Sequence, residues 1–297
     1  MKWIDYVNPN TLDEAVGLLK QHGGTARPLA GGTDLIVLLR VNPERINNPE
    51  LIVDIKGIPE FNELSYSPSA GLTLGAAVPC YRIYQNEAVA KAYPGLIDAA
   101  ALIGGIQIQG RASIGGNLCN STPSADSIPA LIAHNVTCNI IGPSGTRQVA
   151  VEDFCTGPSR NVLQPDEMLV SLHFPPPNKN FGARYIRFIP RNEMDIAVAG
   201  AGVSVVLSNG NFDSVRVALA SVAPTPLLVT DIGDALSGQP VNESSINEAG
   251  RLAKEAASPI DDMRGTVEYR KHLCDVLTRR ALTAAVTRAQ GGTVDAH

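Results

Sequence analysis

The sequence predicts an α+β protein made of two N-terminal α+β regions and a C-terminal module. Three observations support this class. Near the N-terminus, the sequence predicts a strand, a glycine-rich loop, a helix and a second strand in succession. The run Pro175-Pro176-Pro177 is typical of a linker. After this linker, the sequence predicts strands followed by helices. The 297 residues are 44% hydrophobic, enough for a core divided among two or three domains. We place the domains at 1–56, 57–176 and 178–290.

The first region begins with a helix and continues as a β–loop–α–β unit. Thr11-Leu12-Asp13-Glu14 is a capping-box pattern that opens a helix running to about residue 22. A short strand over 26–30 leads into the first glycine loop, an apolar helix over 34–39 follows, and 51–55 is a buried strand. A loop between a strand's carboxyl end and a helix N-terminus is a common place for a phosphate site.

The second region mixes strands and apolar helices. The sequence Gly142-Pro143-Ser144-Gly145 between two β-prone runs predicts a hairpin. The other predicted elements are strands at 72–76 and 168–174 and helices at 95–103 and 125–134.

The third region changes from strands to helices. Asn209-Gly210 predicts a tight hairpin turn between two strands. We expect strands at 183–189, 197–207 and 212–220 and helices at 243–257 and 267–289. The last helix carries a basic face, which we interpret as solvated rather than as a docking surface, formed by Arg270, Lys271, Arg279, Arg280 and Arg288.

Charge and composition exclude several classes of function. The net charge is −5 and no run of lysine and arginine precedes the last helix, which argues against a nucleic-acid partner. No stretch approaches the roughly 18 to 20 apolar residues that a membrane span requires. The N-terminal residues lack the apolar segment of a signal peptide, so we expect a cytoplasmic protein.

The five cysteines are scattered and contain no Cys-x-x-Cys pair. This spacing argues against a disulfide framework, a zinc site or an iron–sulfur cluster held by this chain alone. Cys119 follows the second glycine loop directly, but we interpret the cysteines as small hydrophobic residues.

Two glycine-rich loops are the strongest functional signal: Leu29-Ala30-Gly31-Gly32-Thr33-Asp34 and Ala112-Ser113-Ile114-Gly115-Gly116-Asn117. Adjacent glycines let backbone N–H groups approach an anion, and two such nests suit a dinucleotide better than a single phosphate. The first loop is neither a Gly-x-Gly-x-x-Gly fingerprint nor a P-loop, and by itself reads as a tight turn.

Two longer stretches complete a set of three motifs. The second glycine loop lies within a longer and more specific run over 111–131, and the third motif is Arg187-Phe-Ile-Pro-Arg191-Asn-Glu-Met-Asp195-Ile196-Ala197. In this order and spacing, the three motifs resemble the FAD-binding medium subunits of the molybdenum hydroxylases. That family includes carbon monoxide dehydrogenase, nicotinate and quinoline dehydrogenases and the flavin domain of xanthine dehydrogenase. The resemblance covers about residues 2 to 290.

The resemblance implies a fold, a cofactor and partners. Two lobes of the vanillyl-alcohol-oxidase-like (PCMH) type would clasp FAD, and the C-terminal α+β domain would cover the flavin. A molybdopterin-binding large subunit would oxidise the substrate, and a small subunit with [2Fe-2S] clusters would deliver electrons to this flavin, in a dimer of heterotrimers. The electrons would leave to an external acceptor such as NAD⁺, a quinone, oxygen or a redox protein.

The resemblance also assigns cofactor-binding residues and no catalytic or metal-binding ones. The segment 28–35 would wrap the pyrophosphate, Ser113 to Asn117 would bind it from the other side, Asp126 would accept a hydrogen bond from the cofactor, and Ile196 would lie against the ring. Thr33 excludes the histidyl–flavin bond of some relatives, so FAD would be non-covalent, and Ile103 replaces an aromatic neighbour. The full set is Pro28, Leu29, Ala30, Gly31, Gly32, Thr33, Asp34, Leu35, Ile103, Arg111, Ser113, Ile114, Gly115, Gly116, Asn117, Thr122, Asp126, Arg187, Asp195 and Ile196.

Simpler interpretations remain beside these. Asp126 alone could cap the helix that follows it, and Arg191 with Asp195 could be a surface ion pair. The alternative enzyme is a free-standing FAD-dependent oxidase or reductase of the vanillyl-alcohol-oxidase-like fold, which needs its own base near the flavin. We find no histidine or tyrosine close to the three motifs for that role. A scaffold subunit without flavin is the non-enzymatic alternative, and intact glycine loops argue against it.

Overall fold

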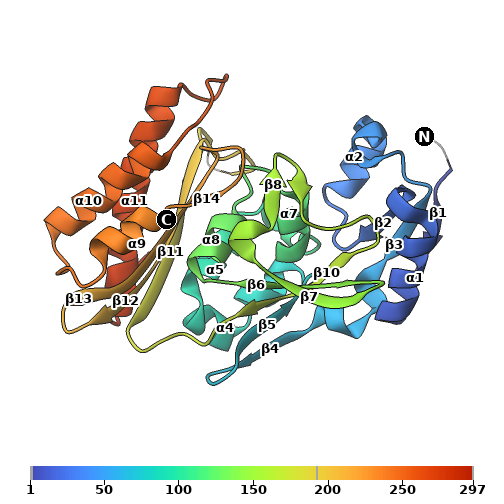
Figure 1. The fold of residues 1–297 in the computed structure, drawn as a ribbon, viewed down its shortest axis with the longest axis horizontal. Coiled ribbons are helices and arrows are strands. Elements are labelled where there is room, and N and C mark those ends of the chain that lie inside the picture. The colour runs from blue at the N-terminus through green and yellow to red at the C-terminus, as the bar shows by residue number, and fades with distance from the viewer. Residues whose placement is uncertain (1–2, 192, 296–297) are drawn as a thin grey trace.

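The computed structural model describes residues 3–191 and 193–295, and it places three main sheets one after another along the long axis (Figure 1). Residues 1–2 of the predicted first region and Asn192 of the third motif lie outside the described residues. The sheets come from successive parts of the chain, as expected for an α+β fold. The domain limits at 56 and at 176–178 stay predictions.

The first sheet is a small parallel one in the order β1–β3–β2. Helix α1 connects β1 to β2, and α2 follows the first glycine loop. Thr11 caps α1 by accepting from the N–H of Glu14, whereas the Glu14 carboxylate turns to the N–H of Asn10, so only half of the predicted capping box forms. Strand β1 escaped prediction because all three of its residues are exposed. The bounds are β1 Asp5–Val7, α1 Leu12–His22, β2 Ala26–Leu29, α2 Leu35–Val41 and β3 Leu51–Asp54.

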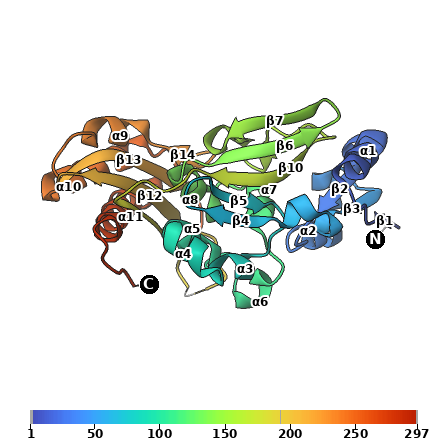
Figure 2. The ribbon, with the colours of Figure 1, turned by 90° about the horizontal axis from the view of Figure 1, so that it is seen from below.

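The second sheet is antiparallel, in the order β4–β5–β10–β6–β7. The hairpin predicted at 142–145 is confirmed, because Gly142 pairs with Gly145 between β6 and β7. Helices α3 to α6 gather along one side of this region (Figure 2). The strands are β4 Leu64–Ser67, β5 Gly71–Gly75, β6 Thr137–Gly142, β7 Gly145–Ala150 and β10 Met168–Phe174, with a separate pair β8 Cys155–Gly157 and β9 Arg160–Asn161. The helices are α3 Cys80–Tyr84, α4 Glu87–Ala92, α5 Pro94–Ala100, α6 Ile106–Gln109, α7 Ile114–Asn120 and α8 Ser127–Ala133.

The third sheet is antiparallel, in the order β11–β12–β13–β14, and both of its faces are covered. On one face, a Cβ added at Gly202 would lie 2.5 Å from the carbonyl oxygen of Pro129 in α8. On the other, a Cβ at Gly182 would lie 2.0 Å from the carbonyl oxygen of Ala285 in α11. The bounds are β11 Phe181–Phe188, β12 Ala199–Ser208, β13 Asn211–Ala220, β14 Leu227–Leu228, α9 Thr230–Leu236, α10 Glu243–Ala256 and α11 Val267–Ala289. The sheet is therefore a layer between the second region and the C-terminal helices (Figure 1).

The basic face of α11 is not mainly a solvated surface, contrary to the prediction. Arg288 donates both Nη atoms to the Asp98 carboxylate of α5, at 2.6 and 2.9 Å, and Arg184 of β11 joins the same carboxylate at 3.1 Å. Arg270 is 4% exposed and donates to the carbonyl oxygens of Val198 and Ser221. Helical periodicity placed these cations on one face, but it could not reveal that carbonyls and a buried carboxylate lie opposite them.

A buried histidine lies where the second and third regions meet. His134 is 4% exposed, its Nδ1 lies 2.7 Å from the carbonyl oxygen of Ala130, and its ring packs against Tyr93, Phe174 and Phe181. Burial lowers the pKa of His134 to about 4, with the Ala130 carbonyl opposing the shift. The imidazole is therefore neutral at pH 7, with its proton on Nδ1.

This histidine predicts a loss of stability in acid. Because the folded-state pKa lies below the unfolded value of about 6.5, the contribution is complete above pH 6.5 and is lost as the pH falls towards 4, by at most about 3 kcal/mol. Denaturant unfolding at pH 7.5, 5.5 and 4.5 measures the loss of unfolding free energy in the wild type and in His134→Gln. The loss should be larger in the wild type, because the other titrating groups are common to both proteins. Equal losses of unfolding free energy in the two proteins would contradict this assignment.

Candidate functional site

A cavity of about 390 Å³ lies between the first region and the second. Its walls come from the two glycine loops and from the segment 161–169 that leads into β10. The loops touch each other, because a Cβ on Gly31 would lie 2.0 Å from the carbonyl oxygen of Arg111. Ligand sites typically have volumes of about 300 to 1,000 Å³, so the cavity is large enough to be one.

The first glycine loop presents free backbone donors to this cavity. Gly32 has a φ of +76°, which turns the chain from β2 into α2. In the described part of the chain, the N–H groups of residues 31–34 donate to no backbone or side-chain acceptor. Asp34 holds the N-cap position of α2 without a side-chain capping bond, so the first turn of this helix is also open to a ligand.

The second glycine loop is itself the beginning of a helix. We expected a nest followed by a helix near residue 125, but α7 starts at Ile114, with Ser113 as its N-cap accepting from the N–H of Gly116 at 3.1 Å. Gly115 is required by a close approach, since its Cβ would lie 2.5 Å from Cα of Ala76. Among the four paired glycines of the two loops, only Gly32 has a positive φ, whereas Gly31 and Gly115 are required by close packing against backbone atoms.

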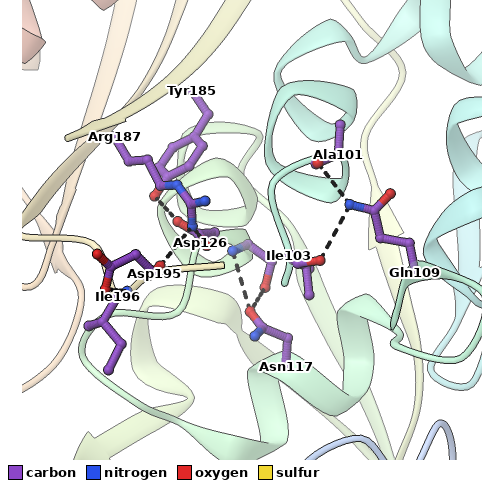
Figure 3. A network of polar contacts seen from close by, with 10 residues as sticks. Ala101, Ile103, Gln109, Asn117, Asp126, Tyr185, Arg187, Asp195 and Ile196 are labelled. Carbon is purple, nitrogen blue, oxygen red and sulfur yellow. Dashed lines mark hydrogen bonds and ion pairs between the residues drawn. The ribbon is translucent and has the colours of Figure 1, made fainter. Parts of the chain in front are cut away.

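A network of polar contacts surrounds Asp126 beside this helix (Figure 3). Its carboxylate accepts from Tyr185 Oη at 2.8 Å and from Arg187 Nη1 at 2.5 Å, and Arg187 also reaches the carbonyl oxygen of Asp195 at 3.5 Å. Tyr185 and Arg187 alternate along β11 and so point to the same face of the sheet. Burial raises the pKa of Asp126 to about 6 against the opposing effects of Arg187 and Tyr185, so the carboxylate is ionised at pH 7.

The same network changes two sequence-based interpretations. Asp126 precedes α8 but makes no side-chain capping bond, so the simple N-cap interpretation is wrong. The sequence analysis found no tyrosine near the motifs, yet Tyr185 lies against Asp126, only two residues before Arg187. Burial, and to a smaller extent the neighbouring Asp126 carboxylate, raises the pKa of Tyr185 well above 10. This phenol therefore stays protonated and cannot serve as a base.

The third motif curves back towards this network. Asp195 Oδ1 accepts from the N–H of Ile196 at 2.8 Å, and its Oδ2 lies 3.4 Å from Arg191 Nε, which confirms the ion pair. Ile196 is 47% exposed and points away from Asp126 in Figure 3. Asn117 accepts from Ser127 Oγ at 2.6 Å and so joins α7 to α8.

Gln109 is a positioning residue that the sequence analysis missed. Its Nε2 donates to the carbonyl oxygens of Ala101 and Ile103, at 2.8 and 3.3 Å, and holds the turn that carries Ile103 (Figure 3). Gln109 is 5% exposed and lies in α6, without a motif to mark it. Only the tertiary structure identifies it.

The structure brings together most of the predicted site residues. Those that line the cavity are Pro28, Ala30, Gly31, Gly32, Thr33, Asp34, Leu35, Ile103, Ser113, Gly115, Gly116 and Asn117. Those outside its lining are Leu29, Arg111, Ile114, Thr122, Asp126, Arg187, Asp195 and Ile196. Polar lining residues that the sequence analysis missed are Arg27, Asn47, Asn120, Asn161, Gln164 and Glu167. Asn120 lies within the second motif without having been singled out, and the other five lie outside the three motifs, so no local pattern marked them.

Candidate metal ligands do not gather in the part of the chain that the structure describes. No group of three or more histidine, cysteine, aspartate or glutamate side chains in that part of the chain could hold a metal ion. Cys119 lines the cavity, but burial raises the pKa of its thiol to about 12, so it remains protonated. Among the described helices, none has the length and apolar character needed to cross a bilayer.

Comparison with known families gives two consecutive matches. Residues 2–177 match the family model described as the FAD binding domain in molybdopterin dehydrogenase. Residues 184–285 match the model described as the CO dehydrogenase flavoprotein C-terminal domain.

Individual relatives match along almost their whole length. The xanthine dehydrogenase FAD-binding subunit of Escherichia coli O157:H7 is 31% identical over 290 residues, covering 97% of this chain and 98% of that one. The carbon monoxide dehydrogenase medium chain of Afipia carboxidovorans is 31% identical over 288 residues, with the same coverage of 97% and 98%. A solved carbon monoxide dehydrogenase from Hydrogenophaga pseudoflava superposes with a TM-score of 0.91 at 30% identity, covering 97% of this chain and 98% of that chain. Quinoline 2-oxidoreductase from Pseudomonas putida 86 gives 0.87 at 28% identity, covering 99% and 100%.

Proposed function

Because this chain belongs to the FAD-binding subunits of the molybdenum hydroxylases, we propose that its cavity holds FAD with the pyrophosphate between the two glycine loops. The chain is the flavoprotein subunit of an oxidoreductase complex, with molybdopterin on a large partner subunit and [2Fe-2S] clusters on a small one. When bound, FAD takes electrons from those clusters and passes them to an external acceptor. The observation that carries the proposal is that both glycine loops line one cavity and that the N–H groups of residues 31–34 in the first loop have no acceptor among the described residues.

The residues present fit this cofactor. The pyrophosphate carries two negative charges, and the free N–H groups of 31–34 and the first turn of α7 offer donors from opposite sides. Beyond the cavity lining, Arg187 Nε is buried and has no hydrogen-bond partner in the described part of the chain. We propose that the end of the site near Arg187 would take the isoalloxazine ring. Asp126 fixes the guanidinium of Arg187 there, and this cation would favour the reduced, anionic flavin.

Two finer features of the assembly belong to the proposal. Relatives that function as medium chains support large and small partner subunits, and we propose that the complex is a dimer of such heterotrimers. We also propose a cytoplasmic location.

Tyr185 does not support the alternative of a free-standing oxidase, because its phenol is held protonated and cannot be the base that such an enzyme needs near the flavin.

Flavin analysis tests the cofactor and its mode of attachment. We expect one FAD per chain, and acid precipitation should release all of the yellow colour, because Thr33 offers no imidazole for a covalent bond. Chromatography of the supernatant identifies the flavin. Colour retained in the pellet, or FMN in place of FAD, would exclude this binding mode, and a colourless native protein would favour the scaffold alternative.

A further inference from the structure

One arginine of the cavity lining has no assigned role. Arg27 belongs to β2, the edge strand of the first sheet, and it lies two residues before the first glycine loop. Arg27 lines the cavity, and its one side-chain hydrogen bond among the described residues runs from Nε to the carbonyl oxygen of Ile46 at 3.3 Å. No carboxylate within the described ranges forms an ion pair with it.

The charges around the cavity set Arg27 apart. Of the described residues that form the lining, Arg27 is the one lysine or arginine. The acid Glu167 is already neutralised, because Arg147 donates to both of its oxygens at 2.8 and 2.7 Å. Asp34 is the other acid of the lining, so its charge and that of Arg27 sum to zero, and without Arg27 the lining would carry a net negative charge that opposes a phosphate.

A partly buried cation without a counter-charge is unfavourable until an anion arrives. Burial lowers the pKa of Arg27, yet a guanidinium remains protonated at neutral pH. Its Nη atoms have no protein acceptor in the part of the chain that the structure describes. The guanidinium fork matches two phosphate oxygens, and charge-assisted bonds of this kind are stronger than those from neutral N–H groups.

We propose that Arg27 is the side-chain counter-charge for the FAD pyrophosphate, binding it together with the N–H groups of the two glycine loops. This inference rests on the proposed function of the cavity. In this proposal, the backbone N–H groups fix the position of the phosphates, and the guanidinium of Arg27 supplies the positive charge. Arg27 thereby favours a ligand that carries a pyrophosphate over the same ligand without one.

The test uses the full chain freed of flavin and titrated with FAD, followed by fluorescence. Arg27→Met should raise the Kd for FAD about 10- to 100-fold, the loss expected for a charged hydrogen bond. It should also reduce the salt dependence of the Kd between 50 and 300 mM NaCl, whereas Arg27→Lys should retain it. Arg40→Met, an exposed arginine of α2 outside the cavity lining, is the matched control and should bind FAD like the wild type.

ADP and adenosine make the test specific for phosphate. ADP should bind the wild type more tightly than Arg27→Met, and adenosine should not distinguish them. If Arg27→Met binds FAD as tightly as the wild type does, binds ADP as tightly as the wild type does, and shows the same salt dependence, the role of Arg27 is overturned. The proposed FAD site would remain intact. A wild type that binds no FAD would overturn the proposed function itself. If Arg27→Met does not fold, Arg27→Gln serves as the neutral variant in the same comparison.

Discussion

A Gly31→Ala protein is expected to purify without yellow colour and to unfold at lower denaturant concentration than the wild type. The added Cβ would lie 2.0 Å from the carbonyl oxygen of Arg111 and 2.7 Å from its carbonyl carbon. Both are backbone atoms, so the two glycine loops must separate. Overpacking of this kind costs about 1 to 3 kcal/mol or more, and it displaces the N–H groups on both sides of the cavity. Flavin content and urea unfolding measure the two effects.

Two other glycines provide controls for this result. Gly17 lies in α1 with nothing within 4 Å of an added Cβ, so Gly17→Ala should keep FAD and gain up to about 1 kcal/mol of stability. A Cβ at Gly116 would meet only Ser113 Oγ, at 3.0 Å, so Gly116→Ala should fold like the wild type although it lines the cavity. A Gly31→Ala protein with normal FAD content and stability would show that the two loops do not have to touch.

The flavin of the isolated chain should remain oxidised when N-heterocycles, aldehydes or carbon monoxide are added without oxygen. In the reconstituted complex, the same flavin should bleach completely. The reason is that, in the proposed function, substrate oxidation belongs to the molybdopterin-binding partner. Absorbance of the flavin band, with and without the partner subunits, measures the difference.

Dithionite is the control for this experiment, because it should bleach the flavin of the isolated chain and prove that it can be reduced. Rapid bleaching of the isolated chain by an organic substrate would instead favour the free-standing oxidase. If the flavin of the complex stays oxidised with every compound, the substrate of the partner subunit lies outside the three classes named. Adding small subunit that has been reduced with dithionite would then test directly whether electrons reach this flavin.

Much of the fold follows from local patterns. The hairpins at 142–145 and 209–210 and the long helix over 267–289 form as predicted, because turn chemistry and helical periodicity are properties of neighbouring residues. Strand β1 and helix α7 were missed. The first has no buried residue, and the second begins with the very glycines that normally argue against a helix.

The sequence by itself determined the class of the protein and its cofactor loops, since glycine pairs and their spacing are written along the chain. Only the tertiary structure decided what each residue of the site does. Gly31 is needed because another loop's carbonyl lies against it, and Asp126 is engaged because Tyr185 and Arg187 reach it from a strand far along the chain. Arg27 faces a cavity without a counter-charge. Burial, close approach and ion pairing depend on distances between segments remote in sequence, and no local pattern encodes those distances.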